Sequence, residues 1–208
     1  MKISLIHATR GRPQRTLAVR QEWLDRAQQP DNVEHIYGID SDDLDTAVAV
    51  GSLLKALAHP PKGCFAAYNA AAAASTGDLL IPIEDDLHPE QGWDSQVTEV
   101  MQPYINEIAA LAVCDGQNAC IEWAFTRKFY EARGLYHPDY FGLFGDTEIR
   151  TRIRDDQVLT VAAPHILFAH QQFQPGGSGN DPIYERKQGK YLDDERTYNI
   201  RMRDGWPA

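Results

Sequence analysis

The amino-acid sequence predicts an α/β fold with a mostly parallel central sheet flanked by helices. Short apolar runs of strand length alternate along the chain with longer segments that suit helices, an alternation that is typical of parallel sheets. Several of these runs end directly in polar residues. The chain has 208 residues, of which 43% are hydrophobic, and it is long enough to form one sizeable core. We therefore expect a single domain.

Two strands with a helix between them are expected at the N-terminus. Residues 3–8 are an apolar run that suits a buried strand. The helix that follows begins at Pro13, because proline is favoured at the first helical position, and it should run roughly to Gln28. A second strand is predicted at residues 33–39, where it ends in the polar cluster 40–43.

The middle of the chain predicts a helix followed by a buried strand. The alanine-rich residues 64–75 have high helix propensity, and Gly77 is placed to end the helix in a left-handed conformation. Residues 79–83 then suit a strand that is buried on both faces. Three acidic residues, 84–86, follow at its carboxyl end, which is where ligands bind in open α/β sheets.

The second half of the chain carries weaker patterns. Residues 108–114, 120–125 and 158–162 are predicted strands, and residues 146–154 are a predicted short helix. The chain after His170 is polar and contains glycine, so we expect it to be rich in loops.

Composition narrows the class of protein. The 30 acidic and 20 basic residues give a net charge of −10, which disfavours binding to nucleic acids and to anionic membranes. The three cysteines form no Cys-x-x-Cys pair of the kind found in redox and zinc sites. The N-terminus lacks the pattern of a signal peptide, and no window approaches the about 18 apolar residues of a membrane span. We therefore expect a cytoplasmic protein without a membrane span.

The acidic triplet from Glu84 to Asp86 is the strongest candidate for a functional site. Three adjacent carboxylates repel one another unless a cation or hydrogen-bond donors neutralise them. Oxygen ligands favour Mg²⁺ or Mn²⁺, which proteins hold with one or two carboxylates together with phosphates of a substrate. The triplet therefore predicts a divalent metal and a diphosphate-bearing substrate. The alternative is that it only begins a solvated loop.

The residues before the triplet carry a family resemblance. Ala66-Ala67-Tyr68-Asn69, Gly77-Asp78 and Glu84-Asp85-Asp86 resemble the core of GT-A glycosyltransferases, a Rossmann-like fold in which an Asn-bearing helix precedes a Gly-Asp strand and an Asp-x-Asp motif. The resemblance implies a compact, family-2-like enzyme of bacterial or phage type. It implies one GT-A domain over residues 1–208, made of a nucleotide-sugar half at about 1–95, an acceptor half at about 96–172 and a loop-rich segment at 173–208.

The resemblance assigns the metal to particular residues. Asp86 stands at the last position of the Asp-x-Asp motif and would bind the metal, while Glu84 replaces the commoner aspartate at the first position and would lie near the ribose or the metal. Asp85 would contact the donor sugar. His170 resembles a late histidine that completes the metal shell in some members, and His165 is the competing candidate. The simpler alternative for either histidine is a hydrogen-bonded structural role.

Further residues are expected from the resemblance to contact the nucleotide. These are Thr9, Arg10, Arg12, Asp40 and Asn69. The alternatives are exposed side chains for the two arginines, an ordinary turn for Asp40, and a capping or solvent-facing role for Asn69. Tyr68 stands where the family often has an arginine, which shifts the charge needed by the diphosphate toward the metal, Lys62 or arginines elsewhere in the chain.

A later segment resembles the acceptor side of the same family. Residues 144–152 place Asp146 at the start of a helix over the active site, with Gly145 where a glutamate usually stands. By this resemblance Asp146 is the general base that deprotonates the acceptor hydroxyl, and the reaction inverts the anomeric carbon. The alternative is that Asp146 caps the helix. The polar residues 174–181 are expected to close over the donor after it binds.

These expectations describe a glycosyltransferase that depends on Mn²⁺ or Mg²⁺. It would move a sugar from a nucleotide-sugar donor, with UDP as the expected nucleotide, to a hydroxyl-bearing acceptor. The acceptor would be a glycan or, if the protein is phage-encoded, a hydroxymethylated DNA base, which the acidic charge disfavours. The alternatives are a nucleotidyltransferase and a catalytically silent protein that binds nucleotide sugars.

Overall fold

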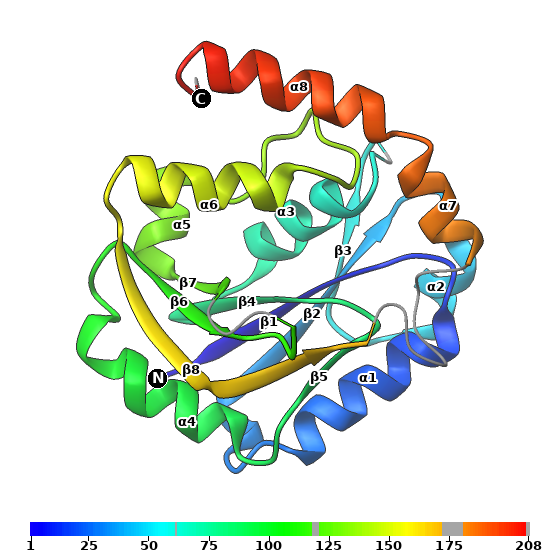
Figure 1. The fold of residues 1–208 in the computed structure, drawn as a ribbon. Helices are drawn as coiled ribbons and strands as arrows, with labels where there is room; N and C mark the ends of the chain where they lie inside the picture. The colour runs from blue at the N-terminus through cyan, green and yellow to red at the C-terminus, as the bar shows by residue number, and fades with distance from the viewer. Residues whose placement is uncertain (61, 118–120, 172–180, 207–208) are drawn as a thin grey trace.

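The computed structural model describes residues 1–60, 62–117, 121–171 and 181–206, which form an α/β fold with helices on both faces of a sheet (Figure 1). Within these residues an eight-stranded sheet has the order β3-β2-β1-β4-β7-β6-β8-β5. Its strands are β1 (Ile3–Thr9), β2 (Val33–Asp40), β3 (Lys55–Ala58), β4 (Leu79–Ile83), β5 (Leu87–Pro89), β6 (Ala109–Cys114), β7 (Ile121–Thr126) and β8 (Leu159–His170). The predicted fold class, a mostly parallel sheet flanked by helices, is confirmed.

The helices lie mainly between the strands in sequence. They are α1 (Pro13–Asp25), α2 (Leu44–Ala49), α3 (Cys64–Ala74), α4 (Trp93–Met101), α5 (Arg127–Arg133), α6 (Gly145–Asp155), α7 (Pro182–Gln188) and α8 (Tyr191–Arg203), with 3-10 turns η1 (Pro30–Asn32) and η2 (Gln102–Tyr104). Figure 1 shows α1 and α4 on one face of the sheet and α3, α5 and α6 on the other. No helix of the described residues has the length and apolarity that crossing a membrane requires.

The first four strands of the sheet are parallel. β1 pairs with β2 and with β4, so that Ile3 lies opposite both Val33 and Leu79. Every residue of β1 and β4 is buried, as expected for strands that are covered on both faces. Their polar ends therefore emerge together at one edge of the sheet.

Strand β8 is longer than the sequence predicted, and it connects the second half of the chain to the first. Its start pairs in parallel with β6, and its end pairs antiparallel with β5, where His170 lies opposite Leu87. The prediction stopped at residue 162 because Pro164 interrupts the apolar run. The register between β6 and β8 shifts in this region, which lets the strand continue past the proline.

Two tryptophans fix one face of the sheet. Trp23 of α1 and Trp93 of α4 are fully buried, with ring centroids 4.9 Å apart, and Trp23 also lies 5.1 Å from the ring of Phe168 in β8. The indole of Trp23 donates a hydrogen bond to the carbonyl of Leu87, at 2.9 Å. This packing holds β5, the strand that follows the acidic triplet.

Small side chains bring α3 close to the opposite face. Ala67, Ala71 and Ala72 are buried against the sheet. At Gly38 of β2 a Cβ atom would lie 2.0 Å from the carbonyl oxygen of Ala67, so the contact requires glycine. The helix therefore packs directly on the strands that carry the site.

Three local expectations are wrong. Gly77 does not end α3 in a left-handed conformation, because the helix already ends at Ala74 and its C-cap residue, Ser75, is extended. Glycine is required at position 77 for a different reason, since a Cβ there would lie 2.4 Å from the hydroxyl of Ser4. Helix α1 ends at Asp25 rather than near Gln28. The segment expected to be loop-rich contains the helices α7 and α8, while residues 172–180, including most of the expected closing segment, lie outside the described residues.

Candidate functional site

The carboxyl ends of three parallel strands bring the predicted residues together. Thr9 ends β1, Asp40 ends β2, and Glu84 directly follows β4. Parallel strands expose their carboxyl ends at one edge of the sheet, where ligands bind in folds of this class. Strand β8 delivers His170 to the same place through its pairing with β5.

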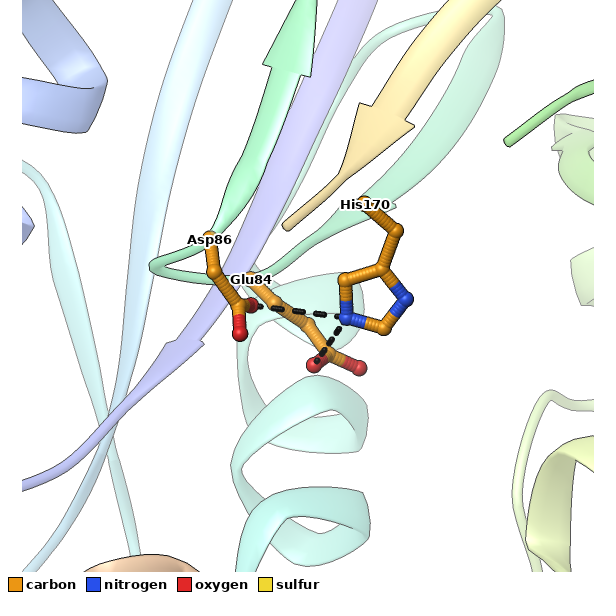
Figure 2. A group of neighbouring side chains, drawn as sticks. All are labelled: Glu84, Asp86 and His170. Atoms are coloured by element: carbon orange, nitrogen blue, oxygen red, sulfur yellow. Dashed lines mark ion pairs between the residues drawn. The ribbon is translucent and has the colours of Figure 1, made fainter. Parts of the chain in front are cut away.

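Glu84, Asp86 and His170 form a candidate metal centre (Figure 2). One possible ligand atom from each residue lies within 4.8 Å of the others. His170 Nε2 is 3.5 Å from Asp86 Oδ1 and 3.7 Å from Glu84 Oε2. These separations are longer than a hydrogen bond, so the three side chains surround a common point without closing on one another.

The three residues fit a divalent cation. His170 Nε2 is buried and has no hydrogen-bond partner within the described part of the chain, which leaves the nitrogen available as a ligand. Neighbouring ligands of Mg²⁺ lie about 3 Å apart when each is about 2.1 Å from the ion, so small side-chain movements complete the site. Burial alone would lower the pKa of His170, but the carboxylates of Asp86 and Glu84 raise it. The same carboxylates attract a cation.

His165, the competing candidate, is not in this group. It is exposed on β8, five residues before the end of the strand. The structure thus places His170, and not His165, beside the acidic triplet.

Asp85 turns away from the candidate metal centre into a buried network. Its carboxylate lies 3.0 Å from His7 Nε2 and accepts hydrogen bonds from the hydroxyls of Thr9, at 3.0 Å, and Thr16, at 3.1 Å. Arg12 Nη1 lies 3.3 Å away. Burial alone would raise the pKa of Asp85, but His7 and Arg12 hold it below its ordinary value. The polar atoms of Thr9 and Asp85, both expected to contact the donor, are therefore engaged inside the protein.

Arg10 and Asp40 form a second charged pair at the edge of the sheet. Arg10 Nη1 lies 2.9 Å from Asp40 Oδ2, and the guanidinium also pairs with Asp42. Asp40 is 2% exposed, and its Oδ1 has no hydrogen-bond partner in the described residues. A buried acceptor without a partner is costly unless a ligand supplies the donor. This makes Asp40 more than a turn residue.

Arg12 connects this edge to the C-terminal part of the chain. Its Nε lies 2.6 Å from Asp181 Oδ2 and its Nη2 lies 2.9 Å from Asp181 Oδ1, a two-point contact. The Arg12 side chain is 17% exposed. Neither Arg10 nor Arg12 is the freely solvated arginine of the simpler alternative.

Two cavities meet at Glu84. The smaller cavity, of about 90 Å³, is lined by Arg10, Asp40 and Asp85 among others, and the larger, of about 370 Å³, by Trp123, Asp146 and His170 among others. Glu84, Cys64, Tyr68, Gly142, Tyr184 and Lys187 line both. Burial raises the pKa of the Cys64 thiol to about 12, so this cysteine is not an activated nucleophile.

Asp146 lies in the larger cavity at the start of α6. Its carboxylate is 49% exposed and forms an ion pair with Arg150, at 3.5 Å, one turn along the helix. The helix begins at Gly145 after Phe144, and no side chain caps it. Asp146 is therefore not the N-cap residue, and its carboxylate remains open to the cavity.

Solved structures were compared with this fold. A mannosyltransferase from Pyrobaculum calidifontis in complex with GDP-Man and Mn²⁺ matches with a TM-score of 0.66 and 14% identity, over 96% of this chain and 64% of that one. TarS 1–349 from S. aureus matches with a TM-score of 0.63 and 9% identity, over 81% and 60%. Glucosyl-3-phosphoglycerate synthase from Mycobacterium tuberculosis, in complex with Mn²⁺, UDP and glucosyl-3-phosphoglycerate, matches with a TM-score of 0.55 and 16% identity, over 93% and 79%.

This chain has the GT-A glycosyltransferase fold. It spans less than two thirds of the length of the first two of those proteins. No protein-family model matches the sequence, and no curated protein sequence matches it.

Asn69 has a different position from the one that the GT-A resemblance implied. The side-chain amide of Asn69 donates through Nδ2 to the backbone carbonyl of Tyr136, at 2.7 Å, and its Oδ1 accepts from the backbone N–H of Tyr136, at 3.2 Å. It does not line either of the two cavities. Asn69 fastens the backbone beneath the larger cavity, which is neither a cap nor a solvent-facing role.

Sequence reasoning missed the residues that α7 adds to the candidate site. Tyr184 and Lys187 of this helix line both cavities, and Arg186 lines the smaller one. The polar sequence around them resembled a loop, because α7 is only seven residues long and presents no sustained apolar stripe. The one local sign of a helix was Asp181 before Pro182, a favoured start.

Proposed function

We propose that this chain is a metal-dependent glycosyltransferase that transfers a sugar from a nucleotide diphosphate sugar, with UDP as the expected nucleotide, to an acceptor hydroxyl. The observation that carries the proposal is the candidate metal centre of Glu84, Asp86 and His170, which lies between two cavities of a GT-A fold. The Pyrobaculum mannosyltransferase with GDP-Man and Mn²⁺ and the mycobacterial synthase with UDP and Mn²⁺ support it.

The smaller cavity would hold the nucleoside. Asp40 Oδ1, which is buried and has no hydrogen-bond partner in the described residues, would accept a hydrogen bond from the ribose or the base. Asp86, Glu84 and His170 would hold Mn²⁺ or Mg²⁺ beside the diphosphate, and the cation would neutralise the charge that develops on this leaving group. The roles proposed for Thr9, Asp85, Arg10 and Arg12 are to support this pocket, because their polar groups are paired within the protein.

The larger cavity would receive the acceptor. Asp146 is proposed as the general base that takes the proton of the acceptor hydroxyl as its oxygen attacks the anomeric carbon. Attack from the side opposite the diphosphate inverts that carbon. The proposed acceptor is a glycan, because Trp123 lines this cavity and aromatic faces suit sugars, while the net charge of −10 disfavours a DNA acceptor.

The first prediction concerns Asp146→Asn. An amide cannot take up the proton, so sugar transfer should fall by at least about 100-fold while the affinity for the nucleotide sugar stays within about twofold. Transfer would be followed as UDP release from UDP-glucose, UDP-galactose and UDP-N-acetylglucosamine with Mn²⁺ and a panel of glycans. Donor affinity would be measured by calorimetry.

Asp155→Asn is the matched control, because Asp155 ends the same helix and is exposed in an ion pair with Arg154. Wild-type transfer by Asp146→Asn would remove Asp146 as the base. The ion pair between Asp146 and Arg150, together with Gly145 in place of the family's glutamate, favours one competing function, a silent nucleotide-sugar-binding protein. Tight donor binding without any UDP release from the wild-type protein would support that function.

A further inference from the structure

Helix α7 is fastened over the site by contacts at its N-terminal end. Asp181 caps the helix by accepting from the amide of Tyr184, at 2.8 Å, and it also holds Arg12 by two contacts. Next to it, Ile183 packs on Gly11, where a Cβ would lie 3.0 Å from the end of the Ile183 side chain. Gly11 also has a φ of 65°, which favours glycine. The first loop of the sheet and α7 therefore form one wall.

Lys187, in the last turn of α7, is the cation that this wall brings to the boundary between the two cavities. Its stem packs on Gly142, where a Cβ would lie 2.9 Å from Lys187 Cγ. The side chain is half-buried and lines both cavities. Burial alone would lower its pKa, but the negative field of Glu84 and Asp146 raises it, so the ammonium stays charged.

The ammonium of Lys187 has no direct partner among the described residues. Glu84 and Asp146 act on it through space, and the structure contains no hydrogen bond or ion pair from the Lys187 ammonium to any of the described residues. A half-buried cation in this situation favours an anionic ligand in the space that it faces. The neighbouring basic side chain, Arg186, is occupied differently, because its guanidinium lies 5.1 Å over the ring of Phe141.

A diphosphate at the candidate metal centre is such an anion. Two phosphates carry more negative charge than one divalent cation neutralises when carboxylate ligands already surround that cation. Helix α3 offers no basic group here, because Tyr68 occupies the wall and donates its hydroxyl to the carbonyl of Ile83, at 3.1 Å. Lysine binds phosphate as a point charge and does not need a two-point geometry.

We infer that Lys187 is a donor-binding residue that contacts the diphosphate of the nucleotide sugar, so that α7 completes the donor site. The inference rests on the proposed function. It gives the C-terminal segment a direct part in binding the leaving group. It also explains how α7 supplies the positive charge for the diphosphate that Tyr68 on α3 does not provide.

Calorimetric titration of the full chain with UDP and with GDP, both with Mn²⁺, tests the inference. Lys187→Met should weaken binding of the diphosphate by about 10- to 100-fold, since a charged hydrogen bond is lost. Binding of uridine or guanosine, followed by NMR titration, should change less than twofold, because a nucleoside has no phosphate. Lys187→Arg should recover most of the lost affinity. A merely structural role of Lys187 would weaken nucleoside and diphosphate alike.

The control is Lys190→Met, which removes an exposed lysine just after α7 that pairs with Asp193, at 3.0 Å, and it should bind UDP as the wild type does. Circular dichroism of both variants checks that α7 and α8 remain folded. If wild-type protein binds UDP or GDP and Lys187→Met binds it equally well, the inference is wrong and the proposed function stands. If wild-type protein binds neither nucleotide with Mn²⁺, the proposed function fails, and the inference fails with it.

Discussion

Asp85 and Asp86 are adjacent and similarly buried, but their carboxylates face different groups. Their exposed fractions are 2% and 1%. The carboxylate of Asp85 accepts hydrogen bonds from protein donors and faces His7 and Arg12, whereas that of Asp86 faces Glu84 and His170 across a gap suited to a cation. We propose that the first arrangement stabilises the fold and that the second binds a cation.

This difference predicts effects of different size on stability. Asp85→Asn should lower the free energy of unfolding by about 2–4 kcal/mol, because it removes a buried charge that compensates Arg12 and accepts hydrogen bonds from Thr9 and Thr16. Asp86→Asn should cost less than Asp85→Asn in EDTA at pH 8, because it also relieves repulsion with Glu84. Urea unfolding of both variants measures the difference. Equal destabilisation by the two substitutions would contradict the separate roles.

At the residue scale, the sequence predicted Asp86 and His170 better than Asn69 or Lys187. Asp86 follows a strand with an unmistakable apolar pattern, so its place at the edge of the sheet follows from topology alone. Asn69 lies on a helix with apolar or small neighbours on every side, and nothing in the chain indicates that its amide faces Tyr136. Lys187 reaches the site through a contact between Arg12 and Asp181, 169 residues apart.

At the scale of elements, one carboxylate links the N-terminal ends of neighbouring parallel strands. Glu34 of β2 pairs with the ammonium of Lys2, accepts from the hydroxyl of Ser4, at 2.6 Å, and accepts from the amide of Gly77, at 2.9 Å. Burial alone would raise the pKa of Glu34, but Lys2, Ser4 and Thr76 lower it to about 2. Glu34 thus connects β1, β2 and the turn before β4.

The lowered pKa of Glu34 predicts how its contribution to the stability of the protein depends on pH. An ionised Glu34 stabilises the fold above about pH 5, where it is also ionised in the unfolded chain, and this contribution is lost as the pH falls toward 2. Glu34→Gln should therefore cost about 1–2 kcal/mol at pH 7, after allowing for solvent screening, and less at pH 4. Urea unfolding at the two pH values measures this, with the exposed Glu131→Gln as control. A cost that does not shrink at pH 4 would contradict the ionic role.

Elements were predictable where local pattern and burial agree. β4 is apolar along its whole length, and β1 and β2 are mostly buried although each includes polar residues, so pattern and structure largely coincide. β8 was predicted only in part, because its residues alternate between buried and exposed and include Pro164. α8 was missed because its sequence is largely polar, and although Tyr198 packs against the core, other contacts of the helix with the core are ionic. Its Arg201 holds the buried Glu148 through two contacts, at 2.7 and 2.9 Å.

At the scale of the whole molecule, the C-terminal helices hold the walls of the site in place. Asp194 of α8 accepts hydrogen bonds from the amides of Phe141, Gly142 and Leu143, and Gly142 lines both cavities. α7 adds Lys187 to the same boundary. Topology alone predicts a site where β1, β2 and β4 end, but the contacts that close it join residues far apart in sequence, which no local pattern encodes.

The central claim is that Glu84, Asp86 and His170 bind a divalent metal together with a nucleoside diphosphate. Electron paramagnetic resonance of Mn²⁺ tests it directly, because the signal of free Mn²⁺ decreases when the protein binds the ion in the presence of UDP. We predict one Mn²⁺ per wild-type chain. Asp86→Asn and His170→Ala should each weaken this binding by at least about 100-fold, since even the loss of groups that only orient metal ligands costs 10- to 100-fold. Mn²⁺ binding that is equal in wild type and Asp86→Asn, or absent in wild type with UDP, would contradict the account.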